Sequence, residues 1–150
     1  MKVILEKVST ANEECALIKA AEVTEEIRNA MDFLENNCRS ISVAELTEDR
    51  SPGETLMLGT DLIYYTESID KKTFVYTKDK CYGTKLRLYE LEESLSANFF
   101  RCSKSLIVNI RKIRSVKSEL NGRMVAVLLN GEQLVINRSY VKDLKRKLGV

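Results

Sequence analysis

A short segment near residue 100 combines small hydroxyl groups with a long cation. In the run NFFRCSKSLIVN (98–109), Ser103, Lys104 and Ser105 separate two apolar stretches. Serine hydroxyls donate short hydrogen bonds to phosphate oxygens, while lysine neutralises phosphate charge or reaches a guanine edge. On this pattern alone, nucleic-acid contact and a solvated loop capped by Ser105 or Asn109 are equally good interpretations.

Signatures of catalysis and of metal binding are missing from the sequence. There is no histidine, and neither a glycine-rich phosphate loop nor a G-x-S-x-G motif occurs. The pattern S-x-x-K occurs at Ser68–Lys71 and Ser139–Lys142, without the partner motifs of serine-lysine acyl enzymes. The four cysteines lack the close spacing of zinc or redox sites, so we expect reduced, mostly buried thiols. We predict no enzyme activity, no metal, no cofactor and no small-molecule substrate.

Charge divides the chain into two halves of opposite sign. Residues 1–70 hold 6 Lys/Arg against 15 Asp/Glu, a net charge of −9, and residues 71–150 hold 18 against 7, a net of +11. The basic residues lie between β-type apolar residues, which favours loops and strand ends carrying the charge toward a polyanion. Residues 1–7 contain an apolar stretch too short for a signal peptide, and no run is long enough to span a bilayer. We therefore expect a cytoplasmic protein.

The periodicity predicts an α+β protein with a mainly antiparallel β C-terminal domain containing two short helices, preceded by a small α+β extension. The polar stretch around Pro52 and Gly53 gives domains at 1–52 and 53–150. The extension should hold strands at 2–8, 15–19 and 40–46 and a helix at 24–36. The second domain should hold strands at 55–59, 62–67, 73–77, 80–87, 99–103, 113–116, 123–130 and 132–137, and helices at 88–96 and 139–148. Alternation in the 99–103 strand, at an edge, should bury Phe100 and Cys102 and expose Phe99 and Arg101. Asn130-Gly131 should close a hairpin as a two-residue turn.

Four stretches, in order, resemble the LytTR family of bacterial DNA-binding regulators. DLIYY (61–65) resembles the opening strand, LYELEESL (88–95) the short helix, and FFRCSKSLIVN (99–109) the specific F-x-R-x-H/S-x-S-x-x-V-N signature. Asn130-Gly131 with NRSYVK (137–142) resembles the closing stretch. The similarity runs from about residue 56 to 148.

The resemblance implies stacked antiparallel sheets whose loops enter successive major grooves of duplex DNA. Three groups of residues would contact the duplex. They are Lys71 and Lys72; Arg101, Ser103, Lys104, Ser105 and Asn109; and Arg138 and Ser139. Ser103 stands where many members have histidine, and Ser139 where many have lysine or arginine. The third contact is thus weaker or differently specific.

Residues 1–52 are too short for the phosphate-receiver domain of many LytTR regulators, so control by phosphorylation is not expected. The layout resembles compact members encoded beside a small membrane protein that restrains them. We predict a homodimer formed through the extension, because short strands in so small a unit need a partner for their edges. The alternative role for the extension is a packing element that only stabilises the second domain. For the whole chain, two alternatives are a protein-interaction module whose basic face docks an acidic partner, and an RNA-binding protein that stacks bases on Tyr64, Tyr65, Tyr76 and Tyr82.

Overall fold

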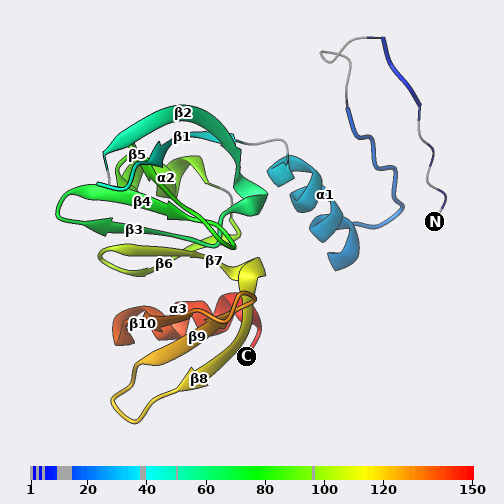
Figure 1. The fold of residues 1–150 in the computed structure, drawn as a ribbon. Helices are drawn as coiled ribbons and strands as arrows, with labels where there is room; N and C mark the ends of the chain where they lie inside the picture. Colours follow the sequence, from blue (N-terminus) through cyan, green and yellow to red (C-terminus); the bar gives the residue numbers. More distant parts are fainter. Residues whose placement is uncertain are drawn as a thin grey trace. The chain divides into compact units, whose positions relative to one another are not determined.

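The computed structural model describes residues 2, 4, 6–9, 15–37, 40–49, 51–95 and 97–150, which fall into two compact units, Met1–Cys38 and Arg39–Val150. We call these the N-terminal unit and the C-terminal unit (Figure 1). The N-terminal unit contains helix α1 (Glu25–Asn37). Its first turn holds Glu25 and Glu26, where the helix dipole favours anions. No described helix in the chain is both long and apolar enough to cross a membrane.

The C-terminal unit consists of two antiparallel sheets with two short α-helices, which confirms the predicted fold class. Its strands are β1 (Ser40–Leu46), β2 (Pro52–Gly59), β3 (Tyr65–Ile69), β4 (Lys72–Tyr76), β5 (Cys81–Thr84), β6 (Phe99–Ser103), β7 (Leu106–Asn109), β8 (Ile113–Ser118), β9 (Met124–Leu128) and β10 (Gln133–Ile136). Its helices are α2 (Leu88–Ser94) and α3 (Arg138–Leu148), with 3-10 turns at Thr60–Leu62 and Ile110–Lys112. The first sheet has the strand order β2-β1-β5-β4-β3-β7-β6, and the second has the order β10-β9-β8.

Two apolar cores hold these layers together, one on each face of the seven-stranded sheet. Along β7, Leu106 and Val108 belong to one core and Ile107 to the other, as the two-residue period of a strand requires. The first core joins this sheet to β9, β10 and α3, whose Leu144 is fully buried. The second core joins the opposite face to α2 through Leu88, Leu91 and Leu95.

The compact units of the structure divide at a different place from the predicted domain boundary. Strand β1 pairs with β2, with Ser40 opposite Gly59, and it also pairs with β5 through Ala44 and Glu45. It therefore belongs to the large sheet and not to an extension. The polar stretch expected to be a linker instead connects β1 to β2, with Pro52 and Gly53 as the first residues of β2. There the Asp49 carboxylate accepts hydrogen bonds from the hydroxyl groups of Ser51 and Thr47, and these bonds lower the pKa of Asp49 to about 2. The unit boundary falls at residues 38 and 39.

Other differences from the predicted elements are local. Cys15–Lys19 form no strand; of the expected strand 2–8, residues 3 and 5 lie outside the described residues and the others are not in a strand. Strand β7 was not predicted as a separate strand. Its four residues are all buried, so it lacks the alternation that identifies half-buried strands. The turn at Asn130 contains three residues, 129–131, with Gly131 at φ +88°, as in hairpins closed by a left-handed glycine.

Three described cysteines are free thiols, and they differ in exposure. Cys102 is buried, Cys81 is half-buried and Cys15 is exposed, so the expectation of mostly buried thiols holds for Cys102 alone. Cys38 lies outside the described residues.

Candidate nucleic-acid interface

The first predicted contact lies at the turn between β3 and β4. Ile69 pairs with Lys72, which leaves Asp70 and Lys71 as a two-residue turn with φ values of 49° and 64°. Two successive positive φ values are the signature of a type I′ turn, whose twist suits a hairpin. Neither residue is glycine, so the conformation needs outside support, and the Arg87 guanidinium donates a hydrogen bond of 3.0 Å to the Lys71 carbonyl. Both Lys71 and Lys72 are exposed.

The second predicted contact is the turn between β6 and β7, which the first turn adjoins. β3 and β7 are neighbours in the sheet, and the Ser68 amide donates to the Ser105 carbonyl at 2.8 Å. Ser105 also donates its amide to the Ser103 hydroxyl oxygen at 3.2 Å. This bond closes the turn and leaves Lys104 exposed at its tip. The Ser-Lys-Ser segment is therefore presented as a compact hairpin tip.

The third predicted contact is the start of α3, beside β6. The Asn137 backbone amide donates to the Cys102 carbonyl at 2.9 Å. This bond connects the start of α3 to β6, next to Ser103. The Asn137 side chain accepts from the Ser139 amide at 3.2 Å and so caps the helix. The helix was predicted to begin at Ser139 and begins at Arg138; Asn137, a favoured N-cap residue, is the sequence signal for that start.

A fourth loop, not predicted as part of the site, packs beside the third contact. The turn between β8 and β9 contains Gly122 at φ +83°, and a Cβ atom there would lie 2.7 Å from Cδ of Arg138. The stem of Arg138 thus lies directly against this turn. Figure 1 shows the β3–β4, β6–β7 and β8–β9 turns and the start of α3 on the same side of the C-terminal unit.

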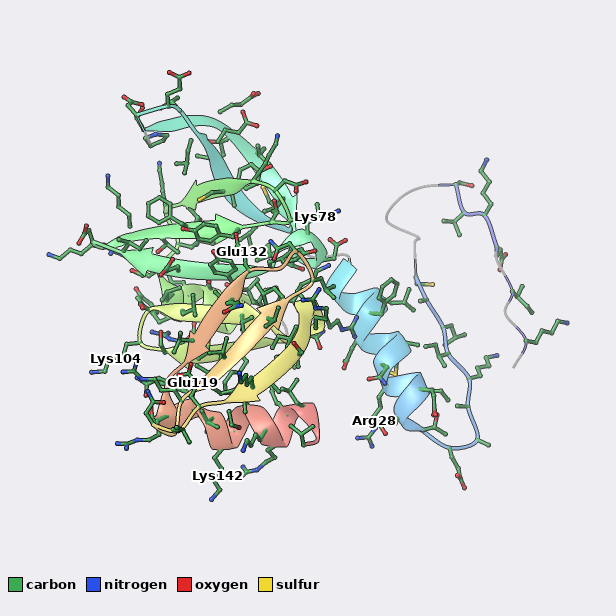
Figure 2. The ribbon with its side chains drawn as sticks, turned by 60° about the horizontal axis from the view of Figure 1, so that its bottom comes forward. Arg28, Lys78, Lys104, Glu119, Glu132 and Lys142 are labelled. Carbon is green, nitrogen blue, oxygen red and sulfur yellow. The ribbon has the colours of Figure 1, made fainter. Side chains whose placement is uncertain are left out.

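We call this surface the basic end. Its proposed contact residues are Lys71, Lys72, Ser103, Lys104, Ser105, Arg138 and Ser139. It carries four cations, all with exposed side chains: Lys71, Lys72, Lys104 and Arg138. Lys78, in the turn between β4 and β5, lies at the other end of the strands; Figure 2 shows it on the opposite side of the unit from Lys104. The main charges predicted for a nucleic-acid contact therefore share one surface.

Two predicted contact residues face inward instead. Asn109 is 3% exposed. Its side-chain Nδ2 donates to the Ile63 carbonyl at 2.9 Å, and its Oδ1 accepts from the Arg111 backbone amide at 3.1 Å. Both polar groups are used inside the fold at the far end of β7, so the structure does not present this side chain for the predicted DNA contact. Arg101, half-buried, donates to the carbonyls of Ser103 and Lys104 and pairs with Glu92 at 3.0 Å.

The neighbouring aromatic residues do not form a platform for stacked bases. Tyr64, Tyr65 and Tyr82 are at most 9% exposed, and the Tyr65 ring stacks on Tyr76 with centroids 4.3 Å apart. Burial, together with a hydrogen bond to Glu132, raises the pKa of Tyr65 above its ordinary value. These rings are part of the core, which disfavours the RNA-stacking hypothesis.

On β6, Cys102 is buried as predicted, but Phe99 and Phe100 are both half-buried and pack against opposite cores.

Comparison with known proteins gives a consistent result. The family model of the LytTr DNA-binding domain matches residues 53–149. The transcriptional regulatory protein YpdB of Escherichia coli K12 is 34% identical over 86 residues, 56% of this chain and 35% of YpdB. An uncharacterised HTH-type transcriptional regulator of Staphylococcus aureus NCTC 8325 is 35% identical over 91 residues, 61% of each chain. The aligned part thus spans about a third to three fifths of these relatives.

A solved structure shares the fold. The LytTr DNA-binding domain of a Bacillus cereus protein superimposes with a TM-score of 0.66 and 26% sequence identity, covering 75% of this chain and 99% of that domain.

Proposed function

Because the chain belongs to the LytTR family of DNA-binding domains, we propose that it is a transcription regulator that reads duplex DNA sequence through its basic end. The observation that supports the proposal is that the turns bearing Lys71 and Lys104 and the helix start bearing Arg138 lie on one side of the C-terminal unit and are joined through backbone hydrogen bonds. Cations on such turns neutralise phosphates, and the start of α3 adds a helix N-terminus that favours an anion.

We assign different tasks to the contact residues. Lys104, at the tip of its hairpin, is the residue for a base edge in the major groove, where lysine recognises guanine. The hydroxyls of Ser103 and Ser105 and the cations Lys71 and Lys72 suit the phosphate backbone. Ser139, which lacks the charge that lysine or arginine would bring, contributes a shorter polar contact beside Arg138.

The test begins with selecting bound duplexes from a random pool, followed by titration of the selected duplex at several salt concentrations. We expect log K to fall with log salt at about −0.9 per neutralised phosphate. A slope near zero would refute DNA binding through the basic end. Capture of an acidic protein by the same surface, without affinity for any duplex, would favour the interaction-module alternative.

For the N-terminal unit we propose self-association through α1. Met31, Phe33 and Leu34 on this helix are 44%, 53% and 41% exposed, an apolar area that a second copy of the helix would cover. The resemblance also implies a small membrane protein as a partner. A basic loop of that protein would bind the acidic residues Glu25 and Glu26 of α1. Within this chain we propose no control by phosphorylation, since the described residues of the N-terminal unit form no cluster of acidic side chains like that of a receiver domain.

A further inference from the structure

Helix α2 touches both lysine-bearing turns without carrying any predicted DNA contact. At its start, Arg87 donates to the Lys71 carbonyl in the β3–β4 turn. Further along the helix, Glu92 pairs with Arg101. Arg101 also donates hydrogen bonds to the carbonyls of Ser103 and Lys104 in the β6–β7 turn. The two ends of one short helix thus hold two different tips.

The helix itself is firmly anchored. Leu88, Leu91 and Leu95 are 6%, 0% and 5% exposed in the second core. Glu90 accepts a hydrogen bond from the Arg87 amide at 2.7 Å, which fixes the first turn. Because α2 packs rigidly on the sheet, side chains that project from it are suited to fix the positions of the tips.

Resting on the proposed function, we infer that α2 is a brace that sets the positions of the two lysine-bearing tips, with Glu92 and Arg87 as positioning residues for DNA recognition. Arg101 is the link between Glu92 and the second tip. Its guanidinium is directed at backbone oxygens within the protein, so it shapes the tip that presents Lys104.

Removing the charge of Glu92 separates this inference from simple electrostatics. Glu92 pairs with Arg101, which contacts the tip that carries Lys104. If only net charge matters, loss of the negative charge of Glu92 should strengthen DNA binding. If Glu92 positions the tip through Arg101, the same change weakens binding of the selected duplex. The two accounts predict opposite signs.

The experiment compares Glu92→Gln with Glu93→Gln in the full chain. Glu93 is an exposed neighbour on the same helix, so its variant removes equal charge. We expect E92Q to bind the selected duplex about three- to fivefold more weakly, the range of a partly exposed ion pair, with random-duplex binding unchanged or tighter. E93Q should bind both duplexes as tightly as the wild type or slightly more tightly. Equal behaviour of the two variants would overturn the inference, whereas a wild-type protein that binds no duplex would overturn the proposed function instead.

Arg87 needs a separate readout because it carries a positive charge of its own. Arg87→Met keeps an unbranched apolar stem and removes the guanidinium that donates to the Lys71 carbonyl. We expect weaker binding of the selected duplex with an unchanged salt slope. A slope that drops by about 0.9 would show that Arg87 itself neutralises a phosphate and would overturn its positioning role.

Discussion

Gly122 and Arg138 lie so close that a single added methyl group on the glycine would meet the arginine stem. The ideal Cβ position at Gly122 is 2.7 Å from Cδ and 3.0 Å from Cγ of Arg138. The β8–β9 turn and the start of α3, which are separate in sequence, therefore lie in direct contact at the basic end. The conformation of Arg138 depends on the absence of a side chain at residue 122.

Gly122→Ala should disturb both stability and DNA binding. The φ of +83° costs an alanine about 1–2 kcal/mol, and the methyl group must also displace Arg138. Gly131→Ala is the matched control, because Gly131 has φ +88° with no atom within 4 Å of the added Cβ. Urea unfolding and duplex titration measure the two effects. We expect both variants to lose stability and only G122A to lose affinity; equal affinities would contradict a role for Arg138 at the interface.

Lys104→Ala should reduce discrimination between the selected and random duplexes by about 1–3 kcal/mol, the value of a good base contact. Lys78→Ala removes the same charge from the opposite end of the unit and should leave discrimination unchanged. Competition titrations at fixed salt give both values. An equal loss by K104A on both duplexes would mean that Lys104 contacts phosphate alone.

Cys102 should resist alkylation in the folded protein at pH 8, while Cys15 reacts. Burial raises the pKa of the Cys102 thiol from 9.0 to about 12. The folded state therefore holds this proton more tightly than the unfolded state. The resulting stability is complete below pH 9 and is lost as the pH rises toward 12. Peptide mass analysis after iodoacetamide treatment, with and without urea, measures the reactivities, and rapid labelling of native Cys102 would contradict the burial.

Leu34→Glu should weaken self-association at least about tenfold, because an apolar side chain buried between two copies of α1 contributes about 1.5–3 kcal/mol. Asn29→Glu adds the same charge at another exposed position of the helix and should change association little. Sedimentation equilibrium of the full chain gives the constants. A wild-type chain that stays monomeric at high concentration would exclude dimerisation through α1.

The sequence predicted the elements whose periodicity is local. Strand β6 occupies the predicted residues 99–103, and α2 and α3 differ from their predicted ranges by at most two residues at either end. β1 was assigned to the wrong unit because its partners, β2 and β5, are set by pairing that no local pattern reports. The polar stretch that ends in Pro52 and Gly53 fits a linker as well as it fits the connection into β2, since linkers and turns favour the same residues.

The site was predicted less completely than the fold. The resemblance assigned contact residues to turns that the structure brings to one side of the C-terminal unit, but it treated all the polar residues of the signature alike. Asn109 satisfies groups in the core, and Arg101 binds backbone oxygens of the tip. Arg87 was missed because its acceptor, Lys71, lies 16 residues away and is a carbonyl group, which a sequence pattern does not reveal.

The links from Ser68 to Ser105 and from Asn137 to Cys102 join main-chain atoms alone. Exchanging the side chains at 71, 104 or 139 would thus leave the spacing of the loops intact. Under the proposed function, such a scaffold would change its operator preference through a few point mutations while keeping its architecture.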